Sequence, residues 1–144
     1  DLEVKRTPEE LKEFVSSTFD SIRADNATKK VARQRKPPFK ELIEEVYPLS
    51  IFCNIKYQGA SVQCCPVIGS QGYDAKIETP SGELIEKIEL TWPIDGQKAH
   101  SQALQLNKKG HTNVEVRDVN NNSDREQIIE RVLQTANNKA LKRK

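Results

Sequence analysis

The chain has 144 residues, of which 35% are hydrophobic and 31% are charged, and its net charge is +2. This length suits one domain, residues 1–144, and the mixture of both charge signs favours a folded domain over a disordered one. The small net charge does not by itself indicate a nucleic-acid partner, and no apolar run approaches the ~20 residues that cross a bilayer, so we expect a cytoplasmic protein without a membrane segment.

The chain opens with a helix signal. Thr7-Pro8-Glu9-Glu10 combines a capping box with a proline at the first helical position, which predicts a helix over residues 8–24. Its apolar residues recur at helical spacing, so one face is expected to pack on the rest of the domain.

A basic segment follows, at residues 28–40. It contains no acidic residue, and its cations are Lys29, Lys30, Arg33, Arg35, Lys36 and Lys40. Such a run is typical of a surface that contacts phosphates, and equally of a solvated linker or the polar face of a short helix.

A second helix is predicted from Pro38 to about Tyr47, ended by Pro48. Glu41 and Glu44 are expected to point away from its apolar stripe. Glu45 lies at the edge of that stripe, from which its side chain can reach over a sheet.

Four strands are predicted next, as two hairpins. Residues 51–57 and 61–67 form the first, and Pro66 indicates that its second strand is short or lies at a sheet edge. Residues 73–78 and 85–92 form the second, around a turn at residues 79–82. The three cysteines, Cys53, Cys64 and Cys65, lack zinc-site spacing and are expected as buried reduced thiols.

The second hairpin carries alternating charges. Because side chains alternate between the faces of a strand, Asp74 shares a face with Lys76, and Glu89 shares a face with Lys87 and Thr91. If the strands pair, Asp74 and Glu89 can lie side by side, and two carboxylates on one sheet face can hold magnesium. The alternative is a solvent-facing ladder of cross-strand charges.

The last third of the chain is predicted as a helix over residues 97–109 with Gly110 after it, a strand over 113–119, and a helix over 123–140 that opens with a capping box. The whole order, helices first and then strands, helix, strand and helix, predicts an α/β (α+β) fold around one central mixed sheet.

This order, with an acid on a middle strand and an acid-x-polar triplet on the next, resembles the PD-(D/E)xK superfamily of restriction-endonuclease-like nucleases. The resemblance covers residues 38–119 as a helix, strand meander, helix and strand core, with the N- and C-terminal helices flanking it. It implies that Asp74 is the first acid, that Glu89-Leu90-Thr91 is the triplet, and that Glu45 (or Glu41) adds a carboxylate. It also implies that the Leu90 carbonyl is a further ligand of Mg²⁺ or Mn²⁺.

Thr91 departs from the family pattern, because the family has a lysine there. Lys76 or Lys87 can stand in for that lysine, or the domain has lost catalysis. The resemblance also implies that the helix after the triplet presents a polar side chain to the site. The candidates are Gln102, Gln105 and His100.

We therefore expect a magnesium-dependent endo- or exodeoxyribonuclease that acts on DNA, in which Lys29, Lys30, Arg33, Arg35 and Lys36 bind the phosphate backbone. The alternatives are a catalytically inactive nuclease-fold module that binds nucleic acid or a protein partner, and an interaction module of a larger assembly. A homodimer, or a place within a larger protein or complex, is compatible with each.

Overall fold

The computed structural model describes residues 1–69, 72–91, 96–112 and 122–141 of the chain. Its contacts divide the chain into two compact units, Asp1–Leu90 and Thr91–Lys144. Each unit is described by itself below.

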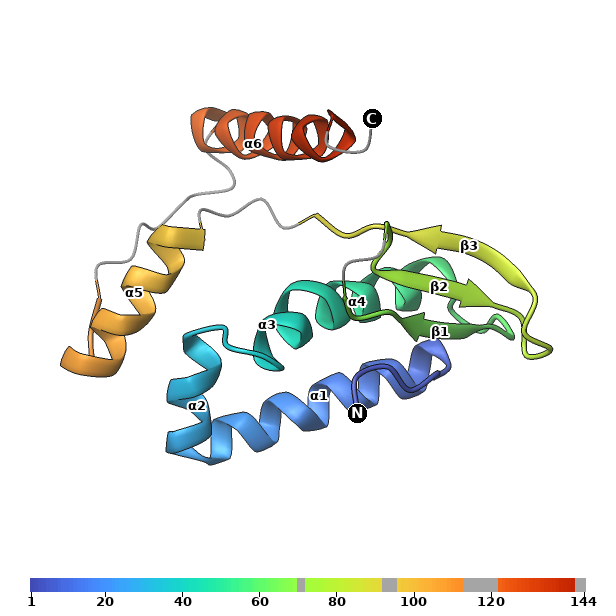
Figure 1. Ribbon diagram of the computed structural model, residues 1–144, viewed down its shortest axis with the longest axis horizontal. Coiled ribbons are helices and arrows are strands. Elements are labelled where there is room, and N and C mark those ends of the chain that lie inside the picture. The colour runs from blue at the N-terminus through green and yellow to red at the C-terminus, as the bar shows by residue number, and fades with distance from the viewer. Residues whose placement is uncertain (70–71, 92–95, 113–121, 142–144) are drawn as a thin grey trace. The chain divides into compact units, whose positions relative to one another are not determined.

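Helix α1 (Pro8–Ala24) opens the first unit, as the sequence predicts (Figure 1). The hydroxyl of Thr7 accepts a hydrogen bond from the Glu10 backbone N–H at 3.2 Å, and the Glu10 carboxylate accepts one from the Thr7 N–H at 2.8 Å. This reciprocal capping box satisfies two of the donors that a helix start leaves open. The basic segment that follows is helical in its first part, as α2 (Asn26–Arg33).

One long helical stretch follows, made of α3 (Phe39–Glu41), the π-helical turn η1 (Leu42–Val46) and α4 (Tyr47–Lys56). The prediction that Pro48 ends this helix is wrong. In η1 the Tyr47 N–H bonds to the carbonyl of Leu42, five residues back. Pro48 then lies in the first turn of α4, where a missing N–H costs little, so the chain continues as a helix.

The predicted strand over residues 51–57 is also wrong, because α4 occupies these positions. The alternation of apolar and polar residues there is a by-product of a helical stripe. Val46, Leu49 and Cys53 are fully buried and recur at intervals of three and four residues, which is the helical period.

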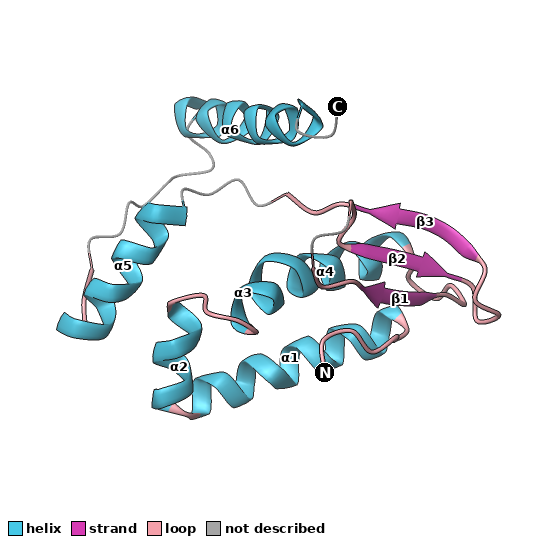
Figure 2. Ribbon diagram, in the orientation of Figure 1, coloured by secondary structure: helices cyan, strands magenta, loops and turns pink. Residues whose placement is uncertain are grey.

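The sheet is a three-stranded antiparallel meander in the order β1-β2-β3, formed by β1 (Gln63–Pro66), β2 (Ala75–Glu78) and β3 (Leu84–Ile88) (Figure 2). Strand β1 is four residues long and forms one edge of this sheet, as Pro66 predicts. Arg6 extends that edge through two backbone hydrogen bonds with Cys64. The predicted second hairpin is thus confirmed, and within the described part of the chain β1 is the strand that pairs with it.

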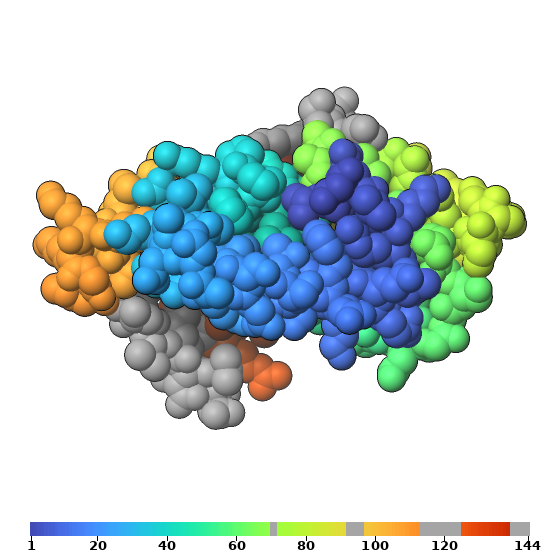
Figure 3. Space-filling model, turned by 90° about the horizontal axis from the view of Figure 1, so that it is seen from below, coloured from blue at the N-terminus to red at the C-terminus, as the bar shows by residue number. Residues whose placement is uncertain are grey.

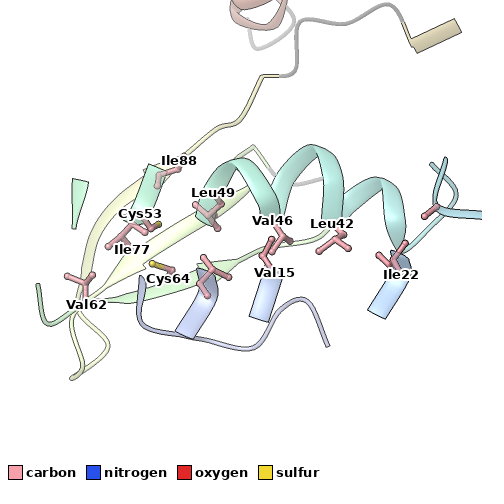
Figure 4. Close-up of a cluster of buried hydrophobic side chains, with 13 residues drawn as sticks. Val15, Ile22, Leu42, Val46, Leu49, Cys53, Val62, Cys64, Ile77 and Ile88 are labelled. Carbon is pink, nitrogen blue, oxygen red and sulfur yellow. The ribbon is translucent and has the colours of Figure 1, made fainter. Parts of the chain in front are cut away.

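The core of this unit lies between α1, α4 and one face of the sheet (Figure 4). Leu11 and Leu49 from the helices and Ile77 from β2 are fully buried. The three cysteines are buried and unpaired, as predicted. Toward the C-terminal end of α1, Phe19 makes an edge-to-face contact with Tyr47 at the start of α4. Figure 3 shows the surface that the N-terminal segment and α1 form over this core.

The second unit contains α5 (Gly96–Lys109) and α6 (Asn122–Leu141), close to the predicted helices. Gly110 follows α5 with a φ of 75°, and its N–H bonds to the Leu106 carbonyl, as a C-terminal glycine cap requires. The predicted strand 113–119 and the capping side chains at Ser123 lie outside the described residues.

The described elements give a mixed α+β fold with a small antiparallel sheet. The finer prediction, a restriction-endonuclease-like core around a larger mixed sheet, remains a prediction. None of the helices in the described ranges is long and apolar enough to cross a membrane.

Candidate functional site

Asp74 immediately precedes β2 and is tied to both neighbouring strands. Its backbone carbonyl accepts a hydrogen bond from the Val67 N–H, and its N–H donates to the Ile88 carbonyl, each at 2.9 Å. Its side-chain Oδ2 accepts a third bond, from the Leu90 N–H at 2.6 Å. The carboxylate thus replaces a strand carbonyl at the point where the β2–β3 ladder ends.

Glu89 leaves β3 at the same end of the hairpin. Ala75 pairs with Ile88 and Lys76 pairs with Lys87, so Asp74 and Glu89 are the next residues beyond the last matched pair. Both are half-buried. The sequence argument placed these two acids side by side if their strands pair. The structure shows that the strands do pair.

Glu45 lies on η1 and is influenced by the charge of Asp74. Burial raises the pKa of the Glu45 carboxyl, and the negative charges of Asp74 and Glu41 raise it further. Asp74 can act on Glu45 in this way only if the two carboxylates lie in each other's field. The helix-borne acid that the sequence predicts over the sheet is thus electrostatically connected to the strand-borne one.

Glu41 lies one helical turn before Glu45 and differs from expectation. It was predicted to point away from the apolar stripe, but its Oε2 atom is enclosed, and within the described part of the chain that atom has no hydrogen-bond partner. An enclosed carboxylate oxygen without a donor is unfavourable unless a cation compensates it. The charge of Glu41 also contributes to the raised pKa of Glu45.

The residues present fit a hard divalent cation in composition. Mg²⁺ takes oxygen ligands and usually keeps several waters, so one or two protein carboxylates suffice. Over residues 1–69, 72–91, 96–112 and 122–141, no three His, Cys, Asp or Glu side chains converge closely enough to form a ready-made cage. Binding of such an ion by Asp74, Glu89, Glu45 and the Leu90 carbonyl therefore remains a prediction.

Lys76 and Lys87 form a directly opposed pair on β2 and β3. Both ammonium groups lie over the ring of Tyr73, at 5.7 Å and 4.7 Å from its centroid. Tyr73 precedes Asp74 in the chain, so this cationic cluster adjoins the acidic end of the hairpin. The sequence argument treated Lys76 and Lys87 as replacements for the family's lysine and missed their cluster with Tyr73.

The basic segment is only partly available for ligands. Arg35 forms an ion pair with Glu44 at 2.7 Å, and both side chains are about one-quarter exposed. Its backbone has a φ of 52°, a left-handed conformation that non-glycine residues seldom adopt. Arg35 therefore connects the segment to η1, whereas Lys30, Arg33 and Lys36 are exposed.

Thr91, Gln102, Gln105 and His100 belong to the second unit. Gln105 accepts a hydrogen bond from the Thr112 hydroxyl at 3.3 Å, and His100 is exposed on α5. Their predicted roles toward the acids of the first unit remain predictions.

A separate apolar groove of 360 Å³ lies between α1 and α4. Phe19, Tyr47, Ile51 and Ile55 contribute its apolar wall, and Lys12 and Arg23 lie at its edge. No carboxylate lines it, so it offers no ligands for a hard cation.

Comparison of the chain with known protein families, curated proteins and solved structures gives no match.

Proposed function

We propose that this chain is a metal-dependent nuclease-like domain that hydrolyses phosphodiester bonds in DNA, with Mg²⁺ or Mn²⁺ as its cofactor. The observation that carries the proposal is the connection of Asp74 to both Leu90 and Glu45. Its carboxylate bonds to the Leu90 N–H, and its charge raises the Glu45 pKa. The hydrogen bond to Leu90 and the electrostatic effect on a helix acid are the two features that support the proposal of a PD-(D/E)xK-like site.

The chemistry that a bound Mg²⁺ supplies in such a site is a lower pKa for its water and neutralisation of charge on the leaving oxygen. The chain contributes Asp74, Glu89 and Glu45 as anionic ligands. Asp74 also orients the backbone at Leu90, whose carbonyl is the fourth proposed ligand.

Positive charge is needed beside the reacting phosphate, and Thr91 cannot supply it. Lys76 and Lys87 are the cations nearest to the acids along their strands, each two residues away. The exposed cations Lys30, Arg33 and Lys36 would hold more distant phosphates, where contacts position the duplex without reading its sequence.

Cleavage assays on plasmid DNA with Mg²⁺ or Mn²⁺ test the proposal. Wild-type protein should nick or linearise the DNA, and Glu89→Gln should reduce the rate to background. Glu83→Gln is the matched control, because Glu83 is an exposed glutamate at the turn end of the same hairpin. Equal activity of the Glu89 and Glu83 variants would refute the assignment of the site.

The second candidate is a nuclease-fold module without catalysis, and Thr91 at the motif lysine is the observation that favours it. Such a module would bind DNA in a salt-dependent manner and cleave none in any divalent metal. Binding to a protein partner instead would direct attention to the apolar groove between α1 and α4.

A further inference from the structure

Two lysines face each other across the middle of the sheet. Lys76 on β2 is the direct register partner of Lys87 on β3. Like charges at directly opposed positions are unfavourable in an antiparallel pair. Within the described part of the chain, neither ammonium group takes part in an ion pair. The fold therefore holds two positive charges next to each other. Glu78 on β2 is an acid whose pKa is lowered by its hydrogen bond with Lys5, and the charge of Lys76 helps to lower it.

The ring of Tyr73 holds both cations in one place. Lys87 Nζ lies 4.7 Å and Lys76 Nζ 5.7 Å from the ring centroid, within the ~6 Å over which a ring attracts a cation. The ring carries no net charge, so it orients the ammonium groups without neutralising them. Each retains N–H donors that an oxyanion can use.

The cluster faces away from the core, on the same face of the hairpin as Asp74 and Glu89. Ala75 and Ile77, which flank Lys76, are 0% exposed, so Lys76 points to the opposite face of β2. By the same alternation Lys87 points away from the buried Ile88. Asp74 precedes Lys76 by two residues and Glu89 follows Lys87 by two, so the cationic and acidic groups adjoin on that face.

We propose that Tyr73, Lys76 and Lys87 form a phosphate-binding subsite, which takes the non-bridging oxygens of a DNA backbone phosphate next to the phosphodiester that the acids act on. Two opposed ammonium groups match the two charged oxygens of one phosphate better than a single lysine does. The assignment of DNA as the source of this phosphate rests on the proposed function.

DNA binding in EDTA tests the subsite separately from catalysis. The full chain is titrated into a short fluorescent DNA duplex at several salt concentrations, and Lys76→Gln/Lys87→Gln is compared with Lys12→Gln/Arg23→Gln. The control removes the same charge from α1, where Lys12 is exposed and the Arg23–Asp20 ion pair is on the surface. Thermal unfolding of all variants checks that each is folded.

The hairpin variant should bind at least about tenfold more weakly near 0.1 M salt, and the slope of log K against log salt should become shallower by about 0.9, the value for one lost phosphate contact on duplex DNA. Lys76→Arg/Lys87→Arg should restore most of the slope. Identical slopes for the hairpin variant and the α1 control would overturn the proposal.

The two proposals fail in different ways. Wild-type protein that binds but does not cleave, while the hairpin variant loses one contact, keeps the subsite and removes the nuclease. Protein that cleaves, with no change of slope in the hairpin variant, removes the subsite alone. A loss seen with an RNA duplex of the same sequence and not with DNA would overturn the assignment of DNA as the ligand.

Discussion

The side chain of Asp74 accepts a hydrogen bond from the backbone N–H of Leu90 at 2.6 Å, across the end of the β2–β3 hairpin. One carboxylate oxygen, Oδ2, thus completes the hydrogen bonding at the end of the sheet. The bond also holds Leu90 beside Asp74, which gives the Glu89-Leu90-Thr91 triplet a defined starting point. A structural and a proposed catalytic role therefore meet in one side chain.

Two substitutions distinguish the structural role of Asp74 from its proposed catalytic role. Asp74→Ala removes a charged acceptor from the partly buried Leu90 N–H and should lower the free energy of unfolding by about 1.5–3 kcal/mol. Asp74→Asn keeps an acceptor for Leu90 and should cost about 1 kcal/mol, yet abolish metal-dependent cleavage. Urea unfolding and plasmid cleavage measure the two effects. Asp20→Ala, on the exposed face of α1, should change stability by less than about 0.5 kcal/mol, and an equal loss there would contradict the argument.

Glu45 makes a prediction about pH. Its ordinary pKa is 4.5, and burial followed by the charge of Asp74 raises its pKa in the folded protein. The folded state therefore binds this proton more tightly than the unfolded state, and stability falls as pH rises from 4.5 through the folded pKa. Glu45→Gln should remove this loss, so the variant should be more stable than wild type near pH 7, with a difference that shrinks on acidification.

Magnesium provides the control for Glu45. A ligand that binds only the folded state raises the unfolding temperature, and at a fixed concentration a tighter ligand raises it more. Mg²⁺ should therefore stabilise the wild type more than Glu45→Gln near pH 7. A variant that is less stable than wild type throughout the pH range would show that the Glu45 charge is compensated.

Helix ends that are marked by capping residues in the sequence were predicted correctly. The Thr7–Glu10 capping box defines the start of α1, and Gly110 defines the end of α5. The prediction that the helix ends at Pro48 was wrong. A proline normally ends a helix, whereas η1 shifts the hydrogen-bond pattern by one residue just before Pro48. A periodicity of apolar residues does not reveal such a shift in the hydrogen-bond pattern.

The candidate site also has a part that the sequence predicted and a part that it did not. Strand alternation was enough to bring Asp74 and Glu89 to one end of the hairpin, because register follows from a turn and a buried face. The enclosure of Glu41 and the Tyr73–lysine cluster depend on which side chains lie nearby in space. The ion pair of Arg35 with Glu44 is a third such case, since the sequence shows only a basic run and an acidic helix.

The Arg35–Glu44 pair predicts a difference within the basic segment. Because Arg35 is engaged and partly buried, Arg35→Gln should lower the free energy of unfolding by about 1 kcal/mol and change the salt slope of DNA binding little. Lys36→Gln, at an exposed position, should leave stability unchanged and make the slope shallower. A double-mutant cycle with Glu44→Gln measures the pair directly, and a coupling near zero would show that it contributes nothing to the fold.

Cys65 predicts a loss of stability in alkali. Burial, and then the charge of Glu78, raises the pKa of its thiol from 9.0 to about 11. The folded state keeps the thiol proton longer than the unfolded state does, so stability falls as pH rises from 9.0 toward 11. Cys65→Ser should flatten this part of the profile. Ellman's reagent should label the three thiols of the native protein slowly and those of the unfolded protein at once, since all three are buried.

Thr91 is the position at which a gain can be tested. The resemblance to the PD-(D/E)xK pattern implies a lysine there that orients or activates the attacking water, and a positioned acid–base group contributes about 10²–10⁴-fold in rate. If the site is a nuclease weakened at this residue, Thr91→Lys should raise metal-dependent cleavage at least about tenfold, and Thr91→Met should not. Single-turnover cleavage in Mg²⁺, with Thr91→Lys/Glu89→Gln as the double variant, measures the effect. The double variant should be inactive because the added lysine acts only on water held at the acids, and a gain that survives the loss of Glu89 would place the chemistry elsewhere on the protein.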